Sequence, residues 1–282
     1  MVTFPRRPVK NTVLFSLVFS LIWGACTIDL PGFFASDDFA ERLKDRNAFV
    51  FLTPQDRNIT LGDTYSFVVL TDTHIEGSDA HGLDRLKRVL LPPSDPGGGD
   101  KFVVVTGDIT QSGYPEEVRT FLEIAKSLGI PCYPVLGNHD TYFGHWPVWR
   151  DLIGSSLYRI DADSATLLIL DTANAAFGAD QLDWIKKELS TAKPRVFAFT
   201  HANFFVDDLT DRQQFTDIKE RAKAISLFTG RCDVLFSGHV HKRIIRDIAG
   251  VRYMSNEDYR SKKTYCRVYV SPGGIRYDFK TL

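Results

Sequence analysis

Short apolar runs recur along the chain from residue 65 onward, and stretches with a different period separate several of them. The runs are rich in β-branched and aromatic residues, as is typical of buried strands, and they span 67–70, 102–105, 133–136, 167–170, 196–199 and 234–236. Apolar residues recur with a helical period over 83–91, 115–128, 179–189 and 215–228. Because strands and helices alternate, we predict an α/β fold built in layers.

The pattern changes after residue 243. Shorter alternating runs cover 244–248, 251–254, 265–270 and 275–279, and turns such as Ala249-Gly250 and Pro272-Gly273-Gly274 separate them. This pattern predicts β-hairpins that form a second, antiparallel sheet edge. Before residue 63 no clean period is visible. We therefore interpret residues 26–62 as a tether that packs partly onto a domain formed by residues 63–282.

Five of the apolar runs end in polar residues that are able to bind a ligand. In chain order these endings read TDTH, TGD, GNHD, TH and SGHVH. In an open α/β sheet the carboxyl ends of the strands border the ligand-binding crevice, so these residues should converge. The converging set is Asp72, His74, Asp108, Asn138, His139, His201, His239 and His241.

The composition of this set predicts metal binding. Two carboxylates, one amide and five imidazoles are costly to bury together unless cations bind them, and no Lys or Arg lies in these strand ends. Residues two apart on an extended segment point to the same side, so Asp72 with His74, and His239 with His241, can each reach one cluster. Ligands of these kinds without a thiolate suit Mn, Fe, Zn or Ni ions.

The five motifs, in this order, resemble those of the calcineurin-like metallophosphoesterase superfamily. They are Asp-x-His at 72–74, Gly-Asp at 107–108, Gly-Asn-His-Asp at 137–140, His201, and Gly-His-x-His at 238–241. The segments IPCYPVLGNHD and GADQLDWIKKEL are also similar to members that resemble class III cyclic-nucleotide phosphodiesterases. The resemblance implies a two-sheet β-sandwich flanked by helices, which covers nearly all of residues 63–282.

The resemblance also implies a role for each residue of the set. One metal ion would be bound by Asp72, His74, Asp108 and His241, and a second by Asp108, Asn138, His201 and His239, so that Asp108 bridges the two. Two such ions would generate a bridging hydroxide that attacks the phosphorus atom in line. His139 is implied to protonate the leaving oxygen or to stabilise the transition state.

Residues next to the motifs leave alternatives open. Asp140 either orients the His139 imidazole or caps a turn. Gln111 stands where many family members have Asp, Asn or Tyr, and the missing Tyr disfavours the purple acid phosphatase branch. The residues after the third motif are expected to pack as a loop more than to line a substrate pocket. They are Tyr142, Phe143, His145, Trp146 and Trp149.

These observations predict an enzyme that hydrolyses phosphomonoesters or phosphodiesters with two bound metal ions. One alternative is a 3′,5′-cyclic-nucleotide phosphodiesterase, and another is a non-catalytic metal-binding scaffold on the same fold. The expected partner is a small phosphorylated substrate. Nucleic acid is not expected as a partner, because the formal net charge is −1 and no long run of Lys or Arg is present.

The first 25 residues have the features of an export signal. Arg6, Arg7 and Lys10 precede an uncharged, mostly apolar run over 12–25, and Cys26 follows directly. This order resembles a bacterial lipoprotein signal, although Trp23 stands where such signals usually have Leu. We therefore expect an exported protein that is anchored to the cell envelope by a lipid at Cys26. The alternatives are a simple cleaved signal, an uncleaved anchor and a cytosolic helix.

Overall fold

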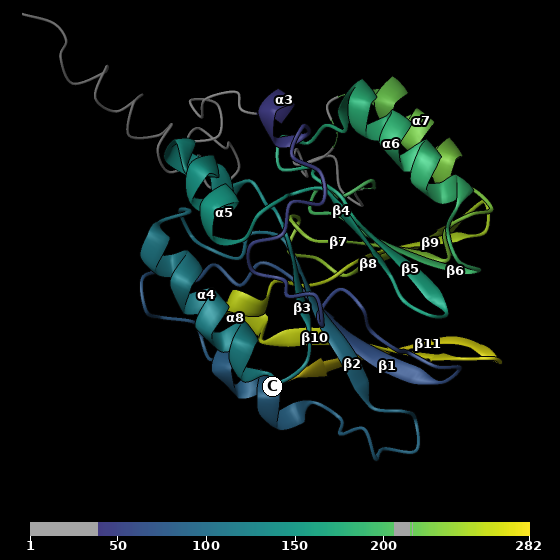
Figure 1. Cartoon of the computed structure of the whole chain (residues 1–282), viewed down its shortest axis with the longest axis horizontal. Coiled ribbons are helices and arrows are strands. Elements are labelled where there is room, and N and C mark those ends of the chain that lie inside the picture. Colours follow the sequence, from purple (N-terminus) through teal and green to yellow (C-terminus); the bar gives the residue numbers. More distant parts are fainter. Residues whose placement is uncertain (1–38, 206–214, 216) are drawn as a thin grey trace, which may run out of the picture.

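The computed structural model describes residues 39–205, 215 and 217–282. The predicted export signal and Cys26 lie outside these residues. No helix in the described part of the chain is long and apolar enough to cross a membrane. The described residues form two β-sheets that face each other, with helices against both outer surfaces (Figure 1). This arrangement confirms the predicted two-sheet α/β sandwich.

The first sheet has antiparallel strands at one edge and the second has them at both edges, and the other neighbouring strands of each sheet run parallel. The first has the strand order β11-β10-β1-β2-β3, with β1 (Tyr65–Leu70), β2 (Asp100–Thr106), β3 (Cys132–Val135), β10 (Thr264–Ser271) and β11 (Gly274–Thr281). The second has the order β4-β5-β6-β7-β9-β8, with β4 (Tyr158–Asp161), β5 (Ala165–Ile169), β6 (Arg195–Phe199), β7 (Val234–Ser237), β8 (Ile244–Ile248) and β9 (Val251–Ser255). Strands β1 to β3 run parallel, as do β5, β6, β7 and β9. Their carboxyl ends therefore lie at one end of each sheet.

The alternation of side chains along each strand divides them between two layers of core. In β1, Phe67 and Val69 belong to the core between the sheets, whereas Val68 and Leu70 pack under the helices. The Phe67 ring meets that of Phe197 from the opposite sheet edge-on, with centroids 5.1 Å apart. Because both faces of the central strands are buried, these strands appear in the sequence as unbroken apolar runs.

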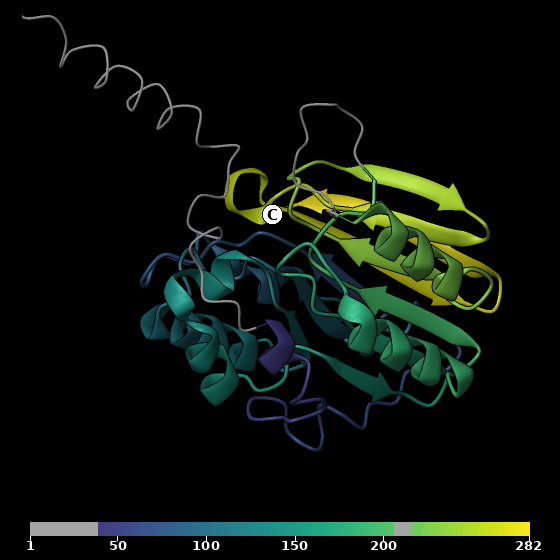
Figure 2. The same cartoon turned by 90° about the horizontal axis from the view of Figure 1, so that it is seen from above.

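Helices cover the outer face of each sheet. Helices α4 (Pro115–Ser127) and α5 (Trp146–Leu152) lie against the first sheet, and α6 (Gly178–Ser190) and α7 (Ile218–Phe228) lie against the second (Figures 1 and 2). The short helices are α3 (Phe39–Arg42), α8 (Tyr259–Lys262) and a 3₁₀ segment over His139–Gly144. The predicted helix over 83–91 is a 3₁₀ helix over Leu83–Val89, because Gly82 in the left-handed region and Pro92 bound it closely.

The prediction that the C-terminal hairpins form one sheet edge is wrong. The β8–β9 hairpin extends the second sheet through β7, and the β10–β11 hairpin extends the first through β1. Between the hairpins, the segment with α8 crosses from one sheet to the other. The N–H groups of Tyr259 and Arg260 donate to the carbonyls of Thr71 and Asp72, which fixes this crossing beside the end of β1. Strand β4 was missed because it is short and half-exposed.

Residues 39–62 are attached to the domain by a buried ion pair. Arg42 is 1% exposed, and its Nε donates to Asp171 Oδ2 at 2.7 Å. Asp171 comes directly after the β5 run and also accepts the Ser156 hydroxyl at 2.7 Å. Three leucines of the same segment are buried, namely Leu43, Leu52 and Leu61. The N-terminal segment therefore shares the core of the domain.

Replacing Arg42 tests how much this ion pair contributes. Because Arg42→Ala leaves the buried Asp171 carboxylate without its partner, we expect the free energy of unfolding to fall by about 3–5 kcal/mol. Urea denaturation followed by tryptophan fluorescence measures the change. Lys223→Ala, which removes an exposed ammonium paired with Asp183 outside this segment, is the control and should leave the midpoint unchanged. An unchanged midpoint for Arg42→Ala would show that the pair does not hold the segment.

Candidate metal centre

The strand ends of both sheets meet at one end of the sandwich. In the first sheet, β1 leads into Asp72 and His74, β2 into Asp108, and β3 into Asn138 and His139. In the second sheet, β6 leads into His201, and β7 into His239 and His241. The eight predicted residues therefore come together, as the sequence indicated. The cluster is built between two sheets, however, and not along the edge of one.

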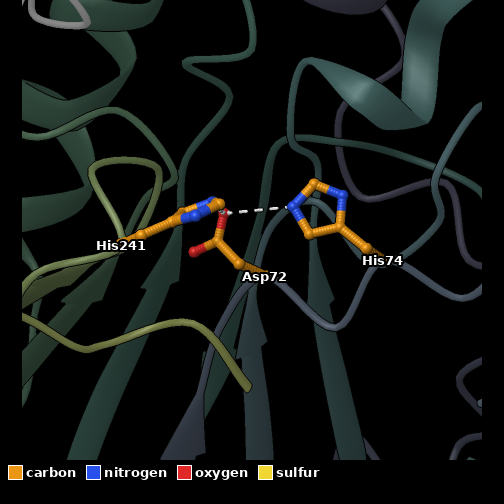
Figure 3. A group of neighbouring side chains, drawn as sticks. All are labelled: Asp72, His74 and His241. Carbon is orange, nitrogen blue, oxygen red and sulfur yellow. Dashed lines mark hydrogen bonds and ion pairs between the residues drawn. The ribbon is translucent and has the colours of Figure 1, made fainter. Parts of the chain in front are cut away.

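Asp72, His74 and His241 form the first group of candidate ligands. His241 Nε2 lies 3.2 Å from Asp72 Oδ1, and His74 Nε2 lies 3.9 Å from the same oxygen. Figure 3 shows the two imidazoles on opposite sides of the carboxylate. The other oxygen, Oδ2, accepts the Thr71 hydroxyl at 2.6 Å and the N–H of His239 at 3.0 Å. These two bonds orient the carboxylate so that Oδ1 faces both histidines.

Asp108, His201 and His239 form a second group, and Asn138 adjoins it. His201 Nε2 lies 3.3 Å from Asp108 Oδ2, 3.0 Å from Asn138 Oδ1 and 3.0 Å from His239 Nδ1. The Nδ1 atom of His201 donates to the Thr106 carbonyl at 2.9 Å. This bond fixes the ring orientation and turns Nε2 toward the group.

The Asp108 carboxylate connects the two groups. Its Oδ2 atom is 3.3 Å from His201 Nε2, 3.9 Å from His74 Nε2 and 4.0 Å from His139 Nε2. Its Oδ1 atom accepts the N–H of His139 at 2.9 Å. Asp108 thus occupies the position that the resemblance gives to a bridging ligand. The ligand role of each residue stays a prediction.

The surroundings and the protonation state of His74 indicate that the cluster can bind cations. Its side chain is buried, and neither ring nitrogen has a hydrogen-bond partner among the described residues. Burial lowers the pKa of His74 to about 4 and that of His239 to about 3, so both imidazoles are neutral at pH 7. Neutral imidazole is the form that binds metal ions, and a buried nitrogen without a partner is costly. The donors present therefore fit a metal site.

Asp72, Asp108, His201 and His241 carry charge near neutral pH. Burial disfavours the charge on Asp108, but His201 and His139 outweigh burial and hold the Asp108 pKa well below its usual range. Burial also disfavours protonated His201, yet the Asp108 carboxylate raises the pKa of His201 to about 9. In the same way His241 lowers the pKa of Asp72 to about 2 against the effect of burial. Metal binding at such pairs displaces the imidazole protons.

Five of the candidate ligands have a left-handed backbone. Their φ angles are 54° for Asp72, 44° for His74, 45° for Asp108, 71° for His239 and 52° for His241. Asp and His adopt this region more readily than most residues, but a cluster of such residues at one place is typical of functional sites. Both Asp-x-His and His-x-His pairs reach the cluster as predicted. They do so through left-handed turns, so the expectation of extended segments is wrong.

Two glycines of the motifs allow ligands from different strands to approach one another. A Cβ atom on Gly238 would overlap the Thr71 hydroxyl and lie 2.8 Å from Asp72 Oδ2. A Cβ atom on Gly107 would overlap the His201 ring. The glycines therefore provide the space in which the ends of the two sheets meet.

Asp140 ties two ligand-bearing loops together. Its buried carboxylate accepts the N–H and the hydroxyl of Thr110 at 2.8 and 2.7 Å, and the N–H of Gly137 at 2.9 Å. Burial, and then the charge of Asp108, raise the pKa of Asp140 to about 6. Of the two roles that the sequence left open, the structure supports the turn-capping one.

The loop around Gln111 orients His139. The Nδ1 atom of His139 lies 2.8 Å from the Gln111 carbonyl, which leaves Nε2 directed toward Asp108. The Gln111 side chain accepts from the Arg260 guanidinium at 2.8 Å. Sequence reasoning missed Arg260, because α8 follows the last motif and no local pattern places it beside the site.

The aromatic residues after the third motif divide into two kinds. Tyr142, Trp146 and Trp149 are buried, in agreement with the prediction of a packed loop. Phe143 is 62% exposed and departs from that prediction. Its ring stacks with that of Tyr114, which comes from the loop before α4.

Comparison with known proteins gives matches in both sequence and structure. The profile of the calcineurin-like phosphoesterase family matches residues 65–243. A Fibrobacter succinogenes protein named a probable cyclic nucleotide phosphodiesterase is 25% identical over 47% of this chain, a match that spans only 54% of that protein. A Nostoc protein named a 3′,5′-cyclic-nucleotide phosphodiesterase is 24% identical over 68% of this chain and 77% of its own. A solved dimetal phosphatase of Danio rerio has a TM-score of 0.57 at 13% identity, over 78% of this chain and 99% of that one, and shares the fold.

Asp140→Asn tests the tie between the two loops. The variant keeps one acceptor oxygen and places an NH₂ group against backbone N–H donors, so we expect a loss of about 1–3 kcal/mol in the free energy of unfolding. Urea denaturation at pH 7.5 measures it. Asp183→Asn makes the same change on the exposed face of α6 and should leave the midpoint unchanged. Equal midpoints for both variants would contradict the role of Asp140.

Proposed function

The chain belongs to the calcineurin-like phosphoesterase family, and from this premise we propose that it hydrolyses a small phosphodiester with two bound metal ions. The motifs predicted both this family and the class of metal-dependent phosphoester hydrolases, and both predictions are confirmed. The preference for diesters is our proposal, and it rests on the relatives, whose names are those of phosphodiesterases.

The arrangement around His74 and Asp108 carries the proposal. The buried neutral imidazole of His74 has no hydrogen-bond partner in the part of the chain that the structure describes, and it faces two carboxylates, one of which also faces the second group of ligands. We assign Asp72, His74, Asp108 and His241 to one ion, and Asp108, Asn138, His201 and His239 to the other. Nitrogen and oxygen donors without sulfur suit Mn, Fe, Zn or Ni. When bound, such ions stabilise charge on the phosphoryl oxygens and lower the pKa of bound water.

His139 is the residue that we assign to the leaving group. Its side chain is 23% exposed, so the ring reaches the edge of the buried cluster. The Gln111 carbonyl accepts the Nδ1 proton, so in the doubly protonated ring the second proton, on Nε2, is available to the oxygen that departs from phosphorus. Since the ring is fixed through Nδ1, protonation at Nε2 requires no rotation of the imidazole.

A 3′,5′-cyclic nucleotide is the substrate that the relatives favour. Both of the named relatives carry the name of a cyclic nucleotide phosphodiesterase, and the Nostoc match extends over most of that protein. The lack of Lys and Arg in the five strand-end motifs is consistent with a small anion whose charge is met by the metal ions. We therefore place cyclic nucleotides first among the candidate diesters.

His139→Ala tests the assignment of the proton donor. Loss of general acid catalysis should lower kcat for cyclic AMP, whose leaving oxygen is an alkoxide, by about 10²–10⁴-fold, and should affect bis(p-nitrophenyl) phosphate much less, because nitrophenolate leaves without a proton. The stabilisation of the protein by Mn(II) should be unchanged, because His139 is not assigned as a ligand. Release of nitrophenolate, nucleotide chromatography and thermal melts with and without Mn(II) provide the measurements. Wild-type turnover of cyclic AMP in this variant would refute the role, and a wild-type protein inactive on both substrates would favour the non-catalytic alternative.

We also propose that the protein is exported and anchored through a lipid on Cys26. The basic start, the apolar run and the position of Cys26 support this proposal. Fractionation of cells that express the full chain should recover it with membranes, and Cys26→Ser should abolish incorporation of a labelled fatty acid. Recovery of the unmodified full chain from the soluble cytosol would argue against export.

A further inference from the structure

Two exposed aromatic side chains stand together near the metal centre. Among the described residues five large hydrophobic side chains are exposed, and the two aromatic ones are Tyr114 at 43% and Phe143 at 62%. Their ring centroids are 6.3 Å apart and their planes differ by 21°. The His145 ring lies 4.8 Å from Tyr114 and 6.1 Å from Phe143. We call these three side chains the aromatic platform. Neighbouring aromatic faces left in water indicate a contact surface.

The backbone holds Phe143 in its exposed position. Its φ and ψ angles are 56° and 22°, in the left-handed region that bulky side chains rarely adopt. The flanking aromatic residues Tyr142 and Trp146 turn inward and are buried. An uncommon backbone conformation that directs an apolar ring into solvent is typical of residues that contact ligands.

The loop that carries Tyr114 is fixed by hydrogen bonds. The buried Glu117 carboxylate accepts the N–H of Ser112 at 3.0 Å and that of Tyr114 at 3.2 Å. The Ser112 carbonyl lies 2.8 Å from His145 Nδ1. The carbonyl of the preceding residue, Gln111, lies 2.8 Å from His139 Nδ1. The carbonyls of two consecutive residues therefore orient a platform histidine and the proposed proton donor. A surface fixed in this way loses little entropy when it binds.

Tyr142 joins the platform to the metal centre. Its ring centroid is 4.3 Å from that of His139 and 6.2 Å from that of Phe143. Its hydroxyl accepts the amide of the candidate ligand Asn138 at 2.9 Å. Tyr142 thus contacts both His139, which we assign to the leaving group, and the platform ring of Phe143.

We propose that the aromatic platform binds a planar aromatic group of the substrate, and that this group is a nucleobase. This inference rests on the proposed function and names the substrate class of the same site. Flat bases stack on Phe, Tyr and His rings whatever their hydrogen-bonding edge, so the platform selects for a base without selecting strongly among bases.

Calorimetric titration of the Mn(II)-loaded protein with AMP and with ribose 5-phosphate tests the platform. The two ligands share phosphate and ribose and differ only in the base. We expect the wild type to bind AMP about 10-fold more tightly or better. Phe143→Ala should remove most of that preference by weakening AMP alone, whereas Phe143→Tyr should retain it. Val50→Ala, a truncation of another exposed apolar side chain, is the matched control.

The outcomes separate the platform from the proposed function. Equal affinities of the wild type for the two ligands, or an AMP preference that survives both Phe143→Ala and Tyr114→Ala, would overturn the platform. Equal weakening of both ligands in Phe143→Ala would overturn it too, because the phosphate site would then be what changed. Hydrolysis of bis(p-nitrophenyl) phosphate by the wild type tests the proposed function separately. A base preference in a protein that hydrolyses no diester would support the platform and contradict that function.

Discussion

The buried carboxylate of Asp108 is a charge that the rest of the site must stabilise. A buried charge is costly unless opposite charge and hydrogen bonds surround it. Around Asp108 the opposite charge comes from the His201 imidazole of the second sheet, 3.3 Å from Oδ2, and the hydrogen bond comes from the backbone N–H of His139 in the first sheet. Only a sandwich whose two sheets end at the same place can supply partners from both sides. The apolar core between the sheets, with Phe67 against Phe197, holds those strand ends in register.

The acids at the strand ends are distinguished by the partners that the fold gives them. Asp171 is paired with the buried guanidinium of Arg42, and Asp140 is satisfied by backbone N–H groups and the Thr110 hydroxyl. Asp72 and Asp108 face imidazoles instead, and one of these imidazoles, His74, has no hydrogen-bond partner among the residues that the structure describes. The first two acids are therefore structural. The other two retain the capacity to bind cations.

Much of this arrangement could be predicted from the sequence, because the central strands are apolar on both faces and each ends in a motif. The eight site residues were found this way, and the family resemblance added the two-sheet architecture. Arg42, Arg260 and Tyr114 could not be found, because each makes its contacts through tertiary packing that leaves no local pattern. Asp140 remained ambiguous for the same reason, since its partners lie on a neighbouring loop. The hairpins were assigned to one edge because alternation reveals a strand but not the sheet that it joins.

The central claim is that the strand ends of the two sheets bind a pair of metal ions that share Asp108. Anomalous diffraction from crystals of the protein grown with Mn(II), collected at the manganese edge, tests it most directly. The account predicts two peaks, one among Asp72, His74 and His241 and the other among Asn138, His201 and His239, with Asp108 in contact with both. A single peak, peaks outside these residues, or no peak at saturating Mn(II) would contradict the account.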